Sequence, residues 1–275
     1  KFPLPNALEY LLEASYFSED MDLRYFIRLS LLKMANSGLY DQLGGGFARY
    51  SVDAKWKVPH FEKMLYDNAQ LISLYSKAYQ IDKQARYKEI IEESCAYISR
   101  EMTHKANGFY SAQDADSDGV EGLFYVWKQS EIDDVLGEDS SLFKSYFQIQ
   151  PQGNWENELN ILYPLESTTD LLDEYHLTAD DLKAQIDKSK EKLFSSRKSK
   201  IHPGLDDKSI TAWNGLMITA YVDAYKALGK SAYLDSAKKA AKFILSLMDN
   251  SGELKRIFKF DKAKIPGFLD DYALS

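Results

Sequence analysis

The chain has 275 residues, of which 45% are hydrophobic, and a formal net charge of -8 at pH 7. The apolar fraction is typical of a globular protein with a sizeable core. The acidic balance and the absence of long basic runs disfavour nucleic-acid binding, anionic membranes and acidic substrates.

No apolar run is long enough to cross a bilayer, and the first residues lack the pattern of a signal peptide. The single cysteine, Cys95, excludes a disulfide framework and a cysteine metal site. We therefore expect a cytoplasmic protein without a cofactor or metal. The chain opens at Lys1 and closes just after an apparent helix start at 268–274, which predicts a fragment of a longer protein. No Pro/Ser-rich linker divides residues 1–275, so we expect one domain.

Helical periodicity dominates the chain. Apolar residues at three-and-four spacing from Leu8 to Tyr16 and from Phe26 to Lys33 predict a first helical hairpin, which Gly38 ends. The same pattern predicts further helices over 60–80, 84–103, 179–196, 207–228 and 231–249.

A similar loop follows three of these helices. Asn36–Tyr40, Asn107–Tyr110 and Asn250–Leu254 each combine a glycine stop with short extended residues. Alternating helices joined by long loops with small β-hairpins at one end predict a ring of helical hairpins. The expected fold class is therefore all-α.

The densest candidate site is the segment 44–69. Its three consecutive glycines allow close backbone approach, but no Gly-Lys-Ser/Thr ending follows, so a phosphate loop is rejected. Pro59 suits the first turn of a helix, which would place His60 at the helix start as a neutral base. His60, Lys63 and Asp67 would then share one side of that helix. The alternative is a solvated face with His60 as a cap; its aromatic and polar neighbours, which include Trp56, favour a site.

The segment 110–127 contains the pattern D-x-D-x-D-G. The twelfth position counted from Asp114 is Tyr125, where a calcium loop needs a bidentate Glu, so an EF-hand is disfavoured. A carboxylate-lined hairpin turn is the simpler interpretation. Its acids either bind turn amides or point at a ligand, with Asp114 and Glu121 as the ligand candidates.

Two later segments, 206–216 and 267–273, repeat the mixture of aromatic and polar residues. Asn214-Gly215 inside a helical pattern costs about 1–2 kcal/mol of helix propensity, which predicts either close packing or an inward polar group. Asp270 and Asp271 either stabilise a helix start or contact a ligand.

Aromatic rings beside amides and carboxylates suit sugars, whose C–H faces stack on rings and whose hydroxyls need directed partners. The residues predicted to bind such a ligand are Arg49, Tyr50, Trp56, Tyr66, Asn68, Trp213, Asn214, Asp270, Asp271 and Tyr272.

Long motifs in these segments also carry a family resemblance. The runs G-G-G-F-x-R-Y-S-V-D-x-x-W-x-V-P-H-F-E-K-M-L-Y-D-N-A, Y-S-A-Q-D-A-D-S-D-G-x-E-G, D-D-K-x-I-T-A-W-N-G-L-M-I and G-F-L-D-D-Y-A resemble the family of spermatogenesis-associated protein 20 and its bacterial relative YyaL. The resemblance implies a thioredoxin-like domain followed by an (α/α)6 toroid similar to N-acylglucosamine 2-epimerase and six-hairpin glycosidases. It further implies that the preceding domain and the last hairpins lie outside this chain.

The sequence thus predicts a carbohydrate-active toroid that is either epimerase/isomerase-like or glycosidase-like, with a central cleft that binds a polyhydroxylated ligand. We expect His60 as acid or base, Asp67 and an acid from Asp114 to Glu121 as partner carboxylates, and a sugar-like small molecule as ligand. The rival hypothesis is a non-catalytic binding or docking module that works with the thioredoxin-like domain. A third interpretation is structural: Arg49, Asp53, Glu62 and Lys63 could form buried ion pairs that lock the glycine-rich loop.

Overall fold

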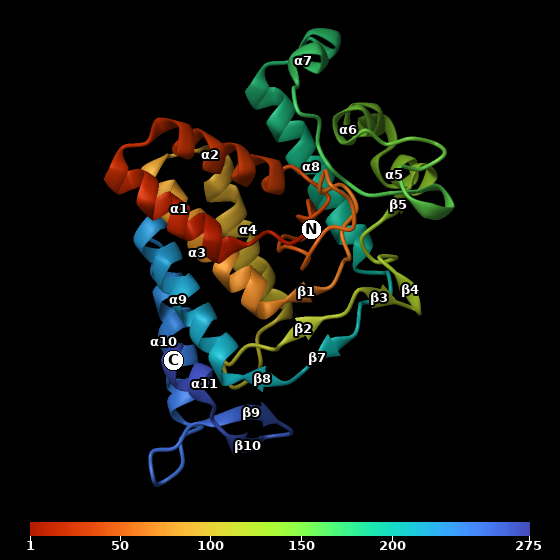
Figure 1. The fold of residues 1–275 in the computed structure, drawn as a ribbon. Coiled ribbons are helices and arrows are strands. Elements are labelled where there is room, and N and C mark those ends of the chain that lie inside the picture. The colour runs from red at the N-terminus through yellow and green to blue at the C-terminus, as the bar shows by residue number, and fades with distance from the viewer.

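The computed structural model describes residues 1–275 and is built mainly from α-helices (Figure 1). The helices are α1 (Pro5–Ser18), α2 (Met21–Ala35), α3 (Leu65–Ile81), α4 (Ala85–Glu101), α5 (Gln129–Leu136), α6 (Ser140–Phe147), α7 (Thr169–Tyr175), α8 (Ala179–Arg197), α9 (Thr211–Leu228), α10 (Ser231–Leu245) and α11 (Leu269–Ala273). The strands are β1 (Lys63–Met64), β2 (Ala112–Gln113), β3 (Asp116–Ser117), β4 (Val120–Glu121), β5 (Trp127–Lys128), β6 (Leu159–Asn160), β7 (Leu205–Asp206), β8 (Ser209–Ile210), β9 (Lys255–Lys259) and β10 (Lys262–Pro266).

Three helical hairpins, α1/α2, α3/α4 and α9/α10, stand side by side in an arc. The first helix of each hairpin packs against the first helix of the next, so α1, α3, α9 and α11 form one row. The second helices, α2, α4 and α10, contact one another much less, as expected of an outer row with a larger circumference. This arrangement is part of an α/α toroid with small β-hairpins at one end, which confirms the predicted fold class.

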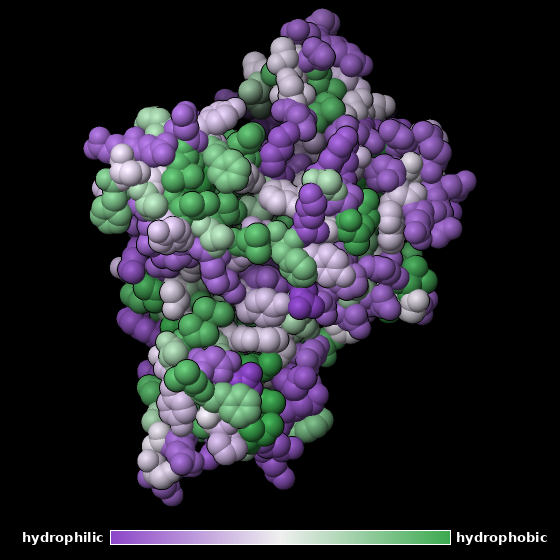
Figure 2. Space-filling model, in the orientation of Figure 1, coloured by the Kyte–Doolittle hydropathy of each residue, from purple (hydrophilic) through white to green (hydrophobic).

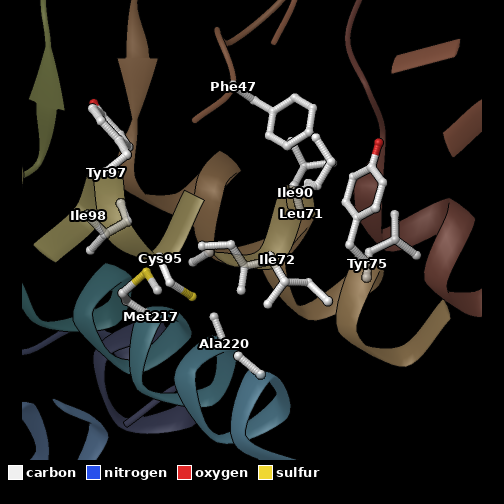
Figure 3. Packing of buried hydrophobic residues seen from close by; sticks show 14 of the residues in the cluster. Phe47, Leu71, Ile72, Tyr75, Ile90, Cys95, Tyr97, Ile98, Met217 and Ala220 are labelled. Atoms are coloured by element: carbon white, nitrogen blue, oxygen red, sulfur yellow. The ribbon is translucent and has the colours of Figure 1, made fainter. Parts of the chain in front are cut away.

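The main core lies between α3, α4 and α9 (Figure 3). Leu71, Ile72, Ile98, Met217 and Ala220 are inaccessible to solvent there, and Cys95 is buried beside them. Each large aliphatic side chain buried in this way stabilises the fold by about 1.5–3 kcal/mol. Helix α3 is buried on most of its surface because it has neighbours on three sides, α1, α4 and α9.

The helices α5 to α8 belong to the long connection between α4 and α9, and Figure 1 shows them grouped on the right. They have a core of their own, which includes Phe143, Phe147 and Leu193. The sequence analysis predicted α8 but not α5, α6 or α7, which have only seven or eight residues each. Short helices show too few periods for a reliable pattern.

Two three-stranded sheets, β1-β2-β7 and β8-β9-β10, lie at the N-terminal ends of α3 and α9. The hairpin β3-β4 turns at Asp118 and Gly119, both of which have positive φ. This conformation is typical of Asp-Gly in a two-residue hairpin turn, so the hairpin predicted in this segment is confirmed.

The predicted helix boundaries need one correction that bears on the site. The helix expected over 60–80 begins only at Leu65, because residues 63–64 pair with β2 as strand β1. The other main helices lie within a few residues of their predicted ranges.

None of the helices combines the length and apolarity that crossing a bilayer requires. Figure 2 shows apolar side chains over α1 and α2, where Phe17 and Phe26 are exposed.

The helix starts repeat one structural device. The fourth residue of α3, α9 and α11 is Asn68, Asn214 and Tyr272, respectively. Asn68 Oδ1 accepts a hydrogen bond from the backbone N–H of Phe47 at 2.8 Å, and Asn214 Oδ1 accepts one from Phe109 at 2.7 Å.

The amide of each asparagine also donates back to the carbonyl of the same phenylalanine. At α11, the Tyr272 hydroxyl accepts from the backbone N–H of Leu254 at 3.1 Å. In each hairpin the loop that follows the outer helix is therefore tied to the start of the next inner helix.

Candidate functional site

A cluster of polar and aromatic side chains lies where α3 and α9 begin. We call it the helix-start cluster, and its members are Arg49, Tyr50, His60, Glu62, Tyr66, Asp67, Glu121 and Trp213. The contacts described below join them into one continuous strip. The members come from four separate segments of the chain.

Asp67, the third residue of α3, carries the most unusual carboxyl group of the cluster. It is buried, and its Oδ2 has no hydrogen-bond partner. Burial raises the pKa of Asp67 to about 7, and the nearby Glu62 carboxylate adds to this shift, whereas the Arg49 guanidinium opposes it. Near neutral pH this carboxyl group can therefore both donate and accept a proton.

Arg49 and Glu62 form an ion pair beside Asp67. Arg49 Nη1 lies 3.4 Å from Glu62 Oε2, and the backbone N–H of Arg49 donates to the Glu62 carbonyl. Arg49 Nε is inaccessible to solvent and has no partner. Burial raises the pKa of the Tyr66 hydroxyl, as does the Asp67 carboxylate, while Arg49 lowers it. Because most buried polar atoms are hydrogen-bonded, two unpartnered atoms in adjacent side chains mark a site that can accept a ligand.

His60 lies at the other end of the strip. Its Nδ1 is 2.9 Å from Glu121 Oε1, and its ring stacks on Tyr50 with centroids 4.7 Å apart. The position predicted for His60 was wrong: it lies in the extended segment before α3, so the dipole of this helix does not act on it as proposed. Lys63 and Asp67 do not share a helix side with it either, since Lys63 belongs to β1.

Two separate groups of aromatic rings lie along the strip. Phe2 lies 5.0 Å from Tyr50 by ring centroids, and the guanidinium of Arg49 lies 6.0 Å from the Phe2 ring. Tyr66 meets Trp213 edge to face at 4.9 Å. Tyr50, Tyr66 and Trp213 are each partly exposed.

Three predicted ligand-binding residues are instead occupied inside the protein. Asn68 and Asn214 are inaccessible to solvent, and backbone groups use both ends of their amides. Asp271 is equally buried: its Oδ1 accepts from the backbone N–H of Ala212, and its Oδ2 accepts from that of Phe268. The prediction that these three side chains contact a ligand directly is therefore wrong. They instead hold the loops and the helix starts in position.

The remaining predicted residues lie at the edge of the cluster or outside it. Asp114 is exposed, and its Oδ1 accepts from the turn amides of Ala115 and Asp116. Asp270 pairs with Arg256 at 3.0 Å, and Tyr272 holds Leu254. Trp56 is partly buried against the main core. The acids of this hairpin were expected either to bind turn amides or to point at a ligand. Asp114 binds turn amides, whereas Glu121 points to His60.

The sequence analysis missed a buried ion cluster next to the site. Asp41 accepts two hydrogen bonds from Arg197, at 2.9 and 3.0 Å, and one from Lys63 Nζ at 2.9 Å. All three side chains are at least 93% buried. Although burial opposes ionisation, Arg197 and Lys63 hold the pKa of Asp41 well below its usual range.

This ion cluster locks the glycine-rich loop. Lys63 Nζ also donates to the Gly45 carbonyl at 2.9 Å, and a side chain at Gly44 would collide with Arg197, whose Nη2 lies 2.0 Å from the Cβ position. The predicted locking role is confirmed for Lys63 alone. Arg49 and Glu62 pair with each other but are partly exposed, and Asp53 accepts hydrogen bonds from Ser51 and from the backbone of Lys55 and Val58 instead of forming an ion pair. Arg197 could not be paired with Asp41 from sequence, because 156 positions separate them.

The central cleft expected at these residues is not among the principal hollows of the molecule. None of the five principal hollows of the molecule is lined by His60, Asp67 or Trp213. No group of three or more His, Cys, Asp or Glu side chains is arranged to hold a metal ion.

Sequence comparison identifies relatives over almost the whole chain. A Caenorhabditis elegans protein of uncharacterized function is 34% identical, and human spermatogenesis-associated protein 20 is 33% identical; each alignment covers 99% of this chain. Over almost its whole length, the chain is therefore similar to one part of spermatogenesis-associated protein 20. It spans only about two fifths of the length of these relatives, 42% and 40% respectively. No family model matches the chain.

Solved structures share the arrangement of the chain more loosely. A family 76 glycoside hydrolase (mannosidase) from Bacteroides thetaiotaomicron is 12% identical with a TM-score of 0.46, over 84% of this chain and 40% of that one. A cellobiose 2-epimerase from Spirochaeta thermophila is 14% identical with a TM-score of 0.38, over 98% of this chain and 67% of that one.

Proposed function

We propose that the helix-start cluster binds a polyhydroxylated, sugar-like carbonyl compound and transfers a proton at the carbon beside its carbonyl group. The observation that carries this proposal is the Asp67 carboxyl group, which is buried, has an unpartnered Oδ2 and has a pKa of about 7. General acid-base catalysis is most effective when the pKa lies near the working pH.

His60 serves as the base. In the neutral imidazole, the Nδ1–H group donates a hydrogen bond to Glu121, so the lone pair lies on Nε2. No protein group hydrogen-bonds to Nε2, which leaves this lone pair free to accept a proton. The carboxylate of Glu121 fixes the tautomer and orients the ring. The stacked Tyr50 ring restricts its rotation further.

Asp67 serves as the acid in the same step. His60 removes the proton from carbon, and protonated Asp67 gives its proton to the carbonyl oxygen, which forms an enediol. Return of one proton to carbon and of the hydroxyl proton to Asp67 then completes an isomerisation or epimerisation. The positive charge of Arg49 stabilises negative charge that develops on the oxygen during the transfer.

Tyr66 and Trp213 provide the surface on which a sugar ring can lie. Both side chains are partly exposed and meet edge to face, which leaves ring faces available for the C–H groups of the ligand. A glycosidase mechanism has less support, because it needs two free carboxylates across a bond. Asp114 is held by turn amides and Glu121 by His60.

The proposal predicts hydrogen exchange before any product is known. Incubation of the chain with a panel of aldoses and ketoses in D2O should replace the hydrogen beside the carbonyl in at least one sugar, seen by proton NMR. His60→Gln and Asp67→Asn should lower this exchange by about 100-fold or more. The matched control Asp118→Asn alters an exposed acid in the β3-β4 turn and should retain full exchange. Equal exchange in all four proteins would remove both residues from the mechanism.

The position of the cluster outside the principal hollows favours a second candidate, a non-catalytic surface that docks a glycan or a polypeptide, such as a thioredoxin-like domain of the full-length protein. A docking surface needs the aromatic residues but not the proton-transfer groups. Under this alternative, Trp213→Ala would abolish binding of the partner, whereas Asp67→Asn and His60→Gln would retain it, and no sugar would exchange hydrogen.

A further inference from the structure

One of the principal hollows of the molecule lies away from the helix-start cluster, at the C-terminal ends of α4 and α8. Its volume is about 490 Å³, which is within the usual range for small-molecule sites. Phe124, Phe194 and Leu205 supply apolar surface, and Arg100, Arg197 and Lys198 supply positive charge. None of these residues belongs to the helix-start cluster, and α4 stands in the outer row of helices.

Arg197 is the feature that points to a ligand. Its side chain is only 2% exposed, and Asp41 occupies both terminal nitrogens. The remaining donor, Arg197 Nε, is buried and has no partner. A buried guanidinium donor normally finds an acceptor, so an unused one in a residue that lines a hollow indicates a place for an external acceptor.

The charge balance of the hollow also favours an anion. Arg100 pairs with Glu101 at 2.9 Å, whereas the single carboxylate of Asp41 is shared by Arg197 and Lys63, so these five groups together keep one positive charge. Lys198 forms no ion pair within the chain, and its Nζ lies 5.6 Å from the centre of the Phe194 ring. One positive charge therefore stays uncompensated at the rim. His202, which also lines the hollow, lies 4.7 Å from Phe124 by ring centroids.

We propose that this hollow binds a small organic anion with a flat apolar body. Its charged group accepts hydrogen bonds from Arg197 Nε and Lys198, and its body lies against Phe124, Phe194 and Leu205. Phosphate monoesters and carboxylates of aromatic compounds have this chemistry. The site is independent of the proton-transfer function proposed for the helix-start cluster.

Phenyl phosphate is a suitable probe, with benzyl alcohol as a neutral ligand of similar shape and inorganic phosphate as an anion without a ring. Calorimetric titration should show that phenyl phosphate binds at least about tenfold more tightly than either comparator, since a charge-assisted hydrogen bond and apolar burial each contribute. Lys198→Ala should weaken its binding by about tenfold. Leu205→Trp should block the hollow and abolish binding.

Lys239→Ala removes one exposed positive charge on α10 and is the matched control, which should bind phenyl phosphate as the wild type does. Undetectable binding of phenyl phosphate, or binding that Lys198→Ala weakens no more than Lys239→Ala does, would overturn the proposal. Equal affinity for benzyl alcohol would also overturn it, because the hollow would then be merely apolar. Lys198 is exposed, so its variant decides the outcome even where Leu205→Trp does not fold.

Discussion

Glu62 and Lys63 are neighbours in the chain, yet they serve two very different groups of charges. Successive side chains of an extended segment point to opposite faces. Glu62 lies with Arg49 beside Asp67, whereas Lys63 enters the buried cluster of Asp41 and Arg197.

The two sides differ in how completely their charges are used. Asp41 accepts hydrogen bonds from both cations and from the loop amides of Leu43 and Gly44, so its oxygens are fully engaged. Asp67 Oδ2 and Arg49 Nε have no partner. A satisfied ion cluster holds a loop in place, while unsatisfied atoms at the edge of a partly open surface are available to a ligand. Whether the polar atoms have hydrogen-bond partners therefore distinguishes the stabilising region from the candidate site. The residue types do not, because both regions combine acidic and basic side chains.

The largest expected effect comes from Asp41→Ala. Removal of this carboxylate leaves Lys63 and Arg197 buried without their anion, which should lower the free energy of unfolding by about 5 kcal/mol. Urea unfolding measures this change. Asp139→Ala, which removes a surface carboxylate that pairs with Lys188 and Lys192, should leave the curve nearly unchanged. Similar curves for both variants would show that the buried cluster does not stabilise the loop.

Asp67→Asn tests the group of charges around Arg49, Glu62 and Asp67, and this substitution should stabilise the protein at high pH. The pKa of Asp67 is about 7 in the folded protein, whereas the ordinary value of 3.8 applies to the unfolded chain. The folded protein therefore binds this proton more tightly than the unfolded chain does. Its contribution to the free energy of unfolding is therefore greatest below pH 4, falls as the pH rises toward 7, and is lost above it. At pH 8 the variant should be more stable than the wild type by up to about 4 kcal/mol. Parallel stability curves from pH 4 to pH 8 for the two proteins would contradict this account.

The same contrast explains how far the sequence could lead. Helical periodicity and the repeated glycine stops predicted the hairpins. The repeated mixture of aromatic and polar residues at helix starts predicted that separate segments meet, and Tyr66 does contact Trp213. The position of His60 was wrong because Pro59 suits both a helix start and an extended segment, and only pairing of the following residues with β2 decides between them. The role of Asp41 depends on a contact across 156 positions, which no local pattern contains.

The asparagines at the helix starts were assigned to the ligand because amides can bind sugars or backbone equally well. Asn214→Ala should lower the free energy of unfolding by about 2 kcal/mol, since it leaves buried backbone groups of Phe109 without partners. Asn250→Ala, at an exposed loop position, is the control. A loss of sugar binding by Asn214→Ala with unchanged stability would restore its predicted contact with the ligand.

The smallest effect is expected for Glu121→Gln. The substitution keeps a hydrogen-bond acceptor for His60 Nδ1 but removes the charge that orients and stabilises the imidazole. Hydrogen exchange of the sugar should fall by about tenfold, less than on removal of His60 itself. Glu131→Gln alters an acid at the start of α5 and should retain the wild-type rate. A Glu121→Gln protein as active as this control would exclude the His60–Glu121 pair from proton transfer.

The state of the Asp67 carboxyl group can be measured directly. A carbon-13 NMR titration that follows the side-chain carboxyl of Asp67 should give a midpoint near pH 7, and Arg49→Gln should move this midpoint upward because it removes the nearby positive charge. A midpoint near pH 4 in the wild type would contradict the account, since Asp67 would then be an ordinary ionised surface acid with no proton to give at neutral pH.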